Sequence, residues 1–322
     1  LLGTGGDTLN IRSTNSTTLT TVDTGAGTAA NTINVGSLAA GSGGIVDTIA
    51  GKLVVIGSGL SDTLHLDDSG DTTPNTVRLT ANRITGLGLG GDDESKGVEY
   101  DNIETLDIEY GTGGSIFNVR GTTATTNIIG LDTDDYIFVS SDANVTAAMV
   151  AAGFDFLTGN LDGIRGTLNI DGRGGRNLLF ISDEGATSGD SNVLITDRKL
   201  AGADPGLDPD RELTITGLAP APISYRASHG GNFARGITIW AGSGDDTITI
   251  DGTLERTELD ADGDPIRVIT TLNTGLGNDR VTVTLTEGQD GFFVLNTQGP
   301  DNNHPTAPDR DRSTPRSRPC RW

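Results

Sequence analysis

The chain has 322 residues, which is enough for one large domain or two ordinary ones, so its length excludes little. Its composition is more restrictive, because 47 residues are glycine and only 4% are aromatic, which excludes a thick aromatic core. The formal net charge of −22 excludes nucleic acid as an expected partner, since phosphate binding requires a basic surface, and makes cations the expected partners.

The first expected element is a short strand that follows a glycine-rich turn. Gly3-Thr-Gly-Gly-Asp-Thr-Leu-Asn10 leads into the alternating run Leu9–Arg12, in which apolar side chains share one face. The chain begins without a methionine and already inside this motif. We therefore expect it to be a segment of a longer protein.

The elements that follow recur later in the chain. Residues 49–70 align without gaps on residues 164–185, at an offset of 115, and the match resumes between 77–80 and 193–196 after one inserted residue. Shorter matches relate 9–12 to 117–120 and 33–35 to 137–139, and a third copy begins at 248. This pattern predicts an internal duplication with approximate units 49–163 and 164–298, and long periods are typical of modules that contain several smaller repeats.

Helix signals are rare, and Ala143–Ala152 is the stretch where we expect a short helix or terminal cap. Segments 200–211 and 256–266 carry proline, aspartate and glycine, and are predicted to be inserted loops. The runs 246–250 and 280–285 alternate apolar residues with threonine and predict strands. Residues 1–298 are thus predicted to form the repetitive β region, followed by a disordered Pro/Arg-rich tail at 299–322.

One motif, Gly-x-Gly-x-Asp-x-apolar-x, is repeated at 3–10, 242–249 and 275–282, and with one extra residue at 57–64. Its glycines let the backbone turn so that carbonyl oxygens point inward, and its aspartate adds a hard anionic ligand for calcium. The motif resembles the haemolysin-type (RTX) calcium-binding nonapeptide and the repeats of giant bacterial surface adhesins. The resemblance implies bound Ca²⁺ with metal-site residues Asp7, Asp62, Asp246, Asp279, Gly5, Gly244 and Gly277.

An alternative role for these aspartates is purely structural. The family's motifs run in immediate tandem so that stacked turns share each ion, whereas the copies here lie tens of residues apart. Aspartate also caps turns by accepting hydrogen bonds from nearby backbone amides. Both readings remain open from the sequence.

No catalytic residue is predicted. The Asp-Asp pairs at 67–68, 134–135 and 245–246 invite comparison with β-helical polysaccharide lyases, but adjacent aspartates are expected in a chain with so many turns. The three histidines are unrelated by spacing and form no zinc motif. Thr-x-Thr pairs such as Thr247 and Thr249 suggest an ice-binding face, although threonine is simply favoured on the outer face of strands.

The predicted fold is all-β, a right-handed parallel β-solenoid (β-helix) with inserted loops, and the alternative is a set of tandem β-sandwich domains. The predicted function is a non-enzymatic structural or adhesive segment of a large secreted or cell-surface bacterial protein, stabilised by calcium and contacting surface glycans. The alternative is a β-helical carbohydrate-active enzyme or glycan-binding module. No membrane insertion is expected, because no apolar run approaches ~18 residues.

Overall fold

The computed structural model describes residues 5–25, 27, 29–59, 61–91, 93–153, 157–197, 212–254, 268–286 and 290–297, and the backbone of 312–315. The predicted loops 200–211 and 256–266 lie outside the described residues, as does the predicted tail 299–322 apart from the strand Arg312–Pro315. The disorder predicted for that tail stays a prediction.

The described chain is nearly all β, as predicted, with one short α-helix and one 3₁₀ turn. The elements are β1 (Thr8–Ile11), β2 (Thr20–Asp23), β3 (Thr32–Val35), β4 (Leu53–Ile56), β5 (Thr63–Asp68), β6 (Thr76–Thr80), β7 (Arg83–Thr85), η1 (Leu89–Gly91), β8 (Val98–Asp101), β9 (Thr105–Tyr110), β10 (Ile116–Val119), β11 (Thr125–Ile129), β12 (Tyr136–Val139), α1 (Ala147–Ala152), β13 (Leu168–Asp171), β14 (Leu178–Ser182), β15 (Val193–Thr196), β16 (Leu213–Thr216), β17 (Ile223–Arg226), β18 (Ile237–Trp240), β19 (Thr247–Ile250), β20 (Ile269–Asn273), β21 (Arg280–Val283), β22 (Phe292–Asn296) and β23 (Arg312–Pro315).

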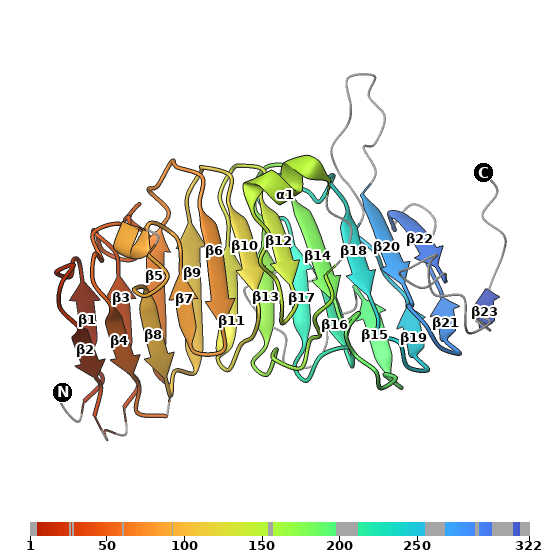
Figure 1. The fold of residues 1–322 in the computed structure, drawn as a ribbon, viewed down its shortest axis with the longest axis horizontal. Coiled ribbons are helices and arrows are strands. Elements are labelled where there is room, and N and C mark those ends of the chain that lie inside the picture. Colours follow the sequence, from red (N-terminus) through yellow and green to blue (C-terminus); the bar gives the residue numbers. More distant parts are fainter. Residues whose placement is uncertain are drawn as a thin grey trace.

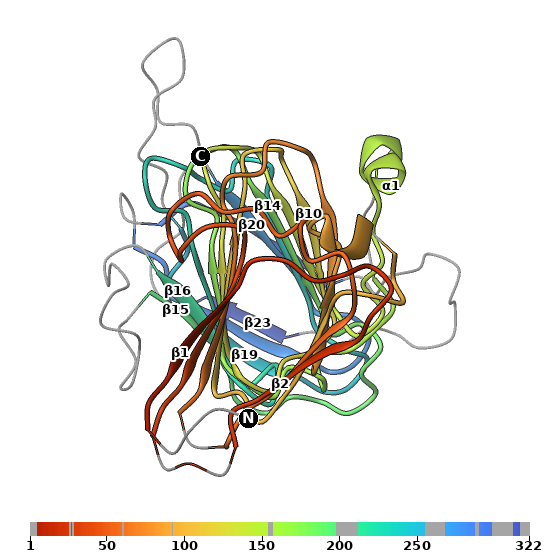
Figure 2. The ribbon, with the colours of Figure 1, turned by 90° about the vertical axis from the view of Figure 1, so that its left-hand side faces the viewer.

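These strands form two long sheets that face each other across the core (Figure 1 and Figure 2). One has 12 strands in the order β1-β3-β5-β9-β11-β13-β17-β16-β15-β19-β21-β23, and the other has 11 in the order β2-β4-β8-β7-β6-β10-β12-β14-β18-β20-β22. We call them the β1 sheet and the β2 sheet. Most consecutive strands alternate between the sheets, so neighbours within a sheet pair in parallel, unlike the antiparallel strands of a β-sandwich.

The core lies between the sheets because apolar and polar residues alternate along each strand. In β3, Ile33 and Val35 are buried, while Thr32 and Asn34 on the outer face are half-buried. The same alternation continues through the stack and joins the inward side chains into one apolar column. Since aromatic residues are few, this column consists mainly of isoleucine, leucine and valine.

In two places among the described strands, three consecutive strands stay in one sheet and pair antiparallel; we call each such group a zigzag. In the β2 sheet, β6, β7 and β8 follow one another, with β8 beside β4 and β6 beside β10. In the β1 sheet, β15, β16 and β17 do the same, with β17 beside β13 and β15 beside β19. The second zigzag lies nine strands after the first, which is the spacing of the duplicated segments.

The predicted internal repeat is therefore visible in the topology, with a feature that the alignment does not reveal. Every strand from β1 to β12 has its counterpart nine strands later in the opposite sheet. Isolated bridges from Thr14 to Ile49 and from Thr122 to Ile164 are equivalent in the two copies. Each repeat crosses between the sheets an odd number of times, so successive copies begin in different sheets.

A second apolar layer covers part of the outer face of the β2 sheet. Phe138, Phe180 and Trp240 point outward from this sheet and pack against Ala143, Val145 and Leu157. Ala143, Val145 and Leu157 lie in the connection between β12 and β13, which also contains α1. This helix confirms the predicted one and lies outside the sheets in Figure 2. Thr146 caps it by accepting a hydrogen bond from the Met149 amide.

Among the described residues, no helix is both long and apolar enough to cross a membrane.

Candidate functional site

The four motif aspartates occupy the same kind of position. Each lies immediately before a strand of the β1 sheet: Asp7 before β1, Asp62 before β5, Asp246 before β19 and Asp279 before β21. Asp246 and Asp279 precede adjacent strands, and Asp7 and Asp62 precede the two strands that flank β3. The structure thus separates the four residues into two pairs near opposite ends of the stack.

In the first pair, side chains before neighbouring strands are linked by a hydrogen-bond ladder. The Asp7 amide donates to Oδ1 of Asn31 at 3.0 Å, and the Asn31 amide donates to Oδ1 of Asp62 at 2.8 Å. The Asp62 amide then donates to Oε2 of Glu104 at 2.7 Å. Each side chain therefore accepts a hydrogen bond from the backbone amide of the residue that precedes the neighbouring, earlier strand. These bonds fix how neighbouring strands stack.

The ladder recurs elsewhere in the fold. The Asp190 amide donates to Asp246 at 2.7 Å, and the Asp246 amide donates to Asp279 at 2.8 Å. In the β2 sheet, the Ser115 amide donates to Asp135 at 2.8 Å. The backbone groups that these side chains bind are not in their own turns but in turns 20 to 56 residues away.

Asp62 has the most complete set of hydrogen bonds. Its Oδ1 accepts from the amide and the side-chain nitrogen of Asn31, and its Oδ2 accepts from the Thr24 hydroxyl and from the amide and hydroxyl of Ser58. Burial opposes ionisation, but the hydrogen bonds from Ser58 and Asn31 outweigh it and lower the Asp62 pKa. This ionised aspartate therefore links the turns that contain Thr24, Asn31 and Ser58.

Asp246 has the opposite environment. Its Oδ1 accepts from Asp190, whereas its buried Oδ2 accepts no hydrogen bond within the described part of the chain. Burial, followed by the negative charges of Asp279 and Asp190, raises the Asp246 pKa to about 7. The same motif position thus holds two buried carboxylates, of which Asp62 accepts hydrogen bonds on both oxygens and Asp246 on only one within the described residues.

The motif glycines also differ in their surroundings. A Cβ on Gly244 would lie 2.1 Å from the Gly189 nitrogen, and one on Gly277 would lie 2.2 Å from the Gly244 carbonyl oxygen. These two positions require glycine because neighbouring turns stack in direct backbone contact. A Cβ on Gly5 would meet no atom within 4 Å among the described residues, so no such requirement applies there.

A different acidic cluster was not predicted from the sequence. One carboxylate oxygen from each of Asp47, Asp68 and Asp71 lies within 4.8 Å of the others. Asp68 is fully buried at the end of β5 and Asp71 is buried just beyond it, while Asp47 is exposed in the connection before β4. Burial, with the charges of Asp71 and Asp47, raises the Asp68 pKa to about 8. In the sequence, only the adjacent aspartates Asp67 and Asp68 drew attention to this cluster.

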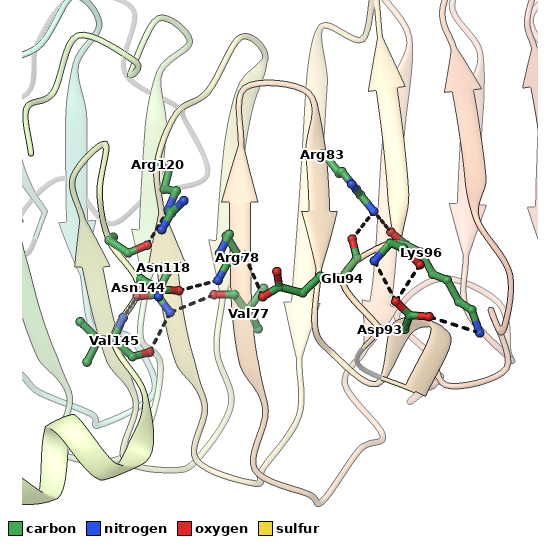
Figure 3. Close-up of polar contacts among 12 residues, drawn as sticks. Val77, Arg78, Arg83, Asp93, Glu94, Lys96, Asn118, Arg120, Asn144 and Val145 are labelled. Carbon is green, nitrogen blue, oxygen red and sulfur yellow. Dashed lines mark hydrogen bonds and ion pairs between the residues drawn. The ribbon is translucent and has the colours of Figure 1, made fainter.

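Basic side chains gather on the outer face of the β2 sheet, where they bind two covering connections (Figure 3). Arg83 on β7 donates to the carbonyl oxygens of Glu94 and Lys96. Arg78 on β6 pairs with Glu94 at 2.8 Å and also contacts Asn144. These arginines therefore hold two loops against the sheet.

Two further contacts complete this arrangement. Arg120 donates to the Ala143 carbonyl oxygen at 2.6 Å, and Lys52 pairs with Glu99 at 2.7 Å. Burial, together with the nearby charge of Arg78, lowers the Arg120 pKa. A carbohydrate-active site would need carboxylates and basic groups from neighbouring strands to converge on a substrate. Here they converge mainly on one another and on the backbone.

The outer face of the β1 sheet carries two straight rows of polar side chains. Strand register places five threonines in one row, Thr8, Thr32, Thr63, Thr105 and Thr125. The second row comprises Asn10, Asn34, His65, Asp107, Asn127, Asn169 and Ser224. Parallel strands lie about 4.8 Å apart, so both rows repeat at close to that spacing.

The second row is a hydrogen-bonded ladder. Asn127 donates to Asp107 at 2.7 Å, Asn169 donates to Asn127 at 2.8 Å, and Ser224 donates to Asn169 at 2.8 Å. His65 forms an ion pair with Asp107 at 3.9 Å. Burial disfavours the charged imidazole, but the contact with Asp107 and the charge of Glu109 raise the His65 pKa.

Substituting Asn127 with alanine is expected to lower the free energy of unfolding by about 1–2 kcal/mol, because it removes two ladder hydrogen bonds from a half-buried site. Urea denaturation measures the change. Thr125→Ala, on the same strand and face, is the matched control, since its exposed hydroxyl forms no hydrogen bond within the described residues. It should change stability by less than about 0.5 kcal/mol. Equal losses in both variants would contradict the ladder's role.

No protein-family model, curated protein or solved structure that was compared with the chain matches it significantly.

Proposed function

We propose that the chain is a segment of a right-handed parallel β-solenoid that serves as a stiff structural and adhesive scaffold in a large secreted or cell-surface protein. The observation that carries this proposal is the unbroken pair of parallel-rich sheets, in which each strand rests directly on the next. Right-handed crossovers are the strong preference for parallel strands, which supports the proposed handedness.

The architecture supports stiffness because contacts between successive strands are continuous. The apolar column, the pre-strand hydrogen bonds and the outer amide ladder all run in the stacking direction. Such a stack resists bending, since bending would separate all three at once. Small-angle X-ray scattering of the chain should give an elongated, rigid particle. A flexible string of compact domains would contradict the scaffold.

The adhesive role is assigned to the threonine row and the amide ladder of the β1 sheet. A flat array of hydroxyl groups suits repeated hydrogen bonding to surface glycans, which present hydroxyl groups at many positions. We expect binding to an array of immobilised glycans, and we expect the double variant Thr63→Tyr/Thr105→Tyr to abolish it by breaking the flat surface.

The matched control for this test is Thr271→Tyr, which changes an outward threonine of β20 in the β2 sheet. This variant should bind glycans like the unmodified chain. If it loses binding equally, the threonine row is not the adhesive face. If the unmodified chain binds no glycan, the adhesive role fails while the scaffold stands.

The carbohydrate-active enzyme remains a second candidate because Lys52, Arg83 and Glu99 meet on the β2 sheet. Their mutual ion pairs argue against it, since a catalytic group must be available to substrate. Incubation with a panel of acidic and neutral polysaccharides tests it directly. Cleavage that disappears in Glu99→Gln would support the enzyme, and no turnover on any polysaccharide would end this candidate.

A further inference from the structure

The cluster formed by Asp47, Asp68 and Asp71 joins two separate connections of the fold. Asp68 ends β5 and Asp71 follows three residues later, whereas Asp47 comes from the connection between β3 and β4. Their carboxylate oxygens approach to within 4.8 Å of one another although all three side chains are acidic. The two buried members lie inside the protein and the exposed member lies at the surface, so an ion could enter from solvent past Asp47.

A second observation at this place indicates a missing partner. The Asp68 side chain is fully buried, and its Oδ1 accepts a hydrogen bond from the Val46 amide at 3.0 Å. Its Oδ2 is shielded from solvent and has no hydrogen-bond partner in the described part of the chain. A buried carboxylate oxygen without a donor is unfavourable unless a cation or a proton satisfies it.

The neighbouring carboxylate is held in place. Oδ1 of Asp71 accepts from the Thr73 amide at 2.9 Å, and Oδ2 accepts from the Asn75 side chain at 2.8 Å. The Thr73 hydroxyl also lies 2.8 Å from Oδ1 and 2.7 Å from Oδ2, and it can donate its one hydrogen to either oxygen. Three hydrogens therefore face the roughly four lone-pair positions of this carboxylate, which leaves about one position for a cation. Asp71 is therefore oriented by its own loop and can still act as a ligand.

We propose that Asp47, Asp68 and Asp71 bind a calcium ion. Three carboxylates supply hard oxygen ligands and three negative charges, with no histidine or cysteine in the cluster to favour zinc. Calcium accepts irregular sets of oxygen ligands, including water, more readily than magnesium does. The bound ion ties the connection before β4 to the end of β5. This site is separate from the motif aspartates, and it does not depend on the adhesive role proposed above.

The second copy of the repeat provides an internal comparison. Asp183 corresponds to Asp68, and its Oδ1 accepts from the Leu161 amide at 2.6 Å just as Asp68 accepts from Val46. Asp162 corresponds to Asp47, but Ala186 stands where the first copy has Asp71. The chain thus contains a nearly matched place that lacks one of the three carboxylates. Asp162→Asn is therefore a matched control for Asp47→Asn.

The test uses the full chain, freed of metal with a chelator, and adds calcium chloride at pH 8. Isothermal titration calorimetry should show calcium binding, and thermal unfolding should show a higher melting temperature with calcium. We expect Asp47→Asn to weaken binding at least about tenfold, since the ligand charge sets calcium affinity. Asp162→Asn should bind like the unmodified chain. Asp47 is exposed, so its variant is expected to fold normally.

A second variant separates binding from folding. Asp68→Asn should abolish the calcium response while keeping or raising the melting temperature without calcium, because a neutral amide suits the buried position. Three results would overturn the proposal: no calcium binding by the unmodified chain, unchanged binding in both Asp47→Asn and Asp68→Asn, or loss of binding in Asp246→Asn alone. The last result would place the ion at the motif turn.

Discussion

Replacing Asp62 with alanine is expected to lower the free energy of unfolding by about 3 kcal/mol or more, because it removes an ionised group that accepts five hydrogen bonds. The amide of Asn31, a buried residue, would lose its acceptor. Urea denaturation with a chelator present measures this effect without any contribution from metal.

Asp246→Asn is the informative comparison, since Asp246 holds the same motif position. At pH 8 this change should leave stability unchanged or raise it, because it replaces a poorly solvated carboxylate with a neutral group of the same shape. Opposite responses at Asp62 and Asp246 would establish that the motif aspartate stabilises the fold near one end of the stack and does not near the other. If Asp62→Ala lowered the free energy of unfolding by less than about 0.5 kcal/mol, Asp62 would not be an important link between these turns.

Raising the pH from 5 to 9 is expected to lower the melting temperature by about 5 °C or more in the presence of a chelator. Burial raises the pKa values of Asp135, Asp183 and Asp246 to about 7 in each case. At pH 5 these groups are protonated in the folded chain but ionised in the unfolded chain. Their stabilising contribution is present at acidic pH and is lost as the pH rises through about 7.

The opposite trend applies at lower pH. Asp62, Asp67 and Asp71 have lowered pKa values because hydrogen bonds to their ionised forms outweigh burial. Their contribution is present above the ordinary aspartate pKa and is lost as the pH falls below it. The most stable condition should therefore be mildly acidic. Asp183→Asn should reduce the fall in stability between pH 5 and about 7. A profile that rises steadily from pH 5 to 9 would contradict this assignment.

The strands could be predicted because they depend on local alternation. The alternation in runs such as 246–250 indicates which residues face inward, and the structure places β19 there. The duplication was equally visible, since it is a direct comparison of the chain with itself. The exchange of sheets between copies was not, because it depends on how many times the chain crosses the core.

The contacts of the site could not be predicted for a related reason. The motif suggested that Asp62 either binds calcium or caps its own turn. It does cap its own turn through Ser58, but it also accepts hydrogen bonds from Thr24 and Asn31 in earlier parts of the chain, which the sequence did not reveal. Asp47 and Asp68 become neighbours only when their connections stack. Sequence spacing carries no record of such contacts, because the connections between strands vary in length.

The threonine row illustrates the same limitation. Thr-x-Thr pairs within single strands are visible in the sequence, whereas the row takes one threonine from each of five strands. Successive members Thr8, Thr32 and Thr63 are unevenly spaced along the chain, so no period reveals them. Register within the sheet aligns them.

The exchange of sheets between successive copies decides what a longer array would present to its surroundings. If further copies continued the stack, each equivalent surface would appear alternately on two opposite sides of the rod. A flat ligand approaching from one side would then meet only every second copy, while two such ligands could be bridged by neighbouring copies. Removing one copy would turn every later surface to the other side without changing any of its contacts.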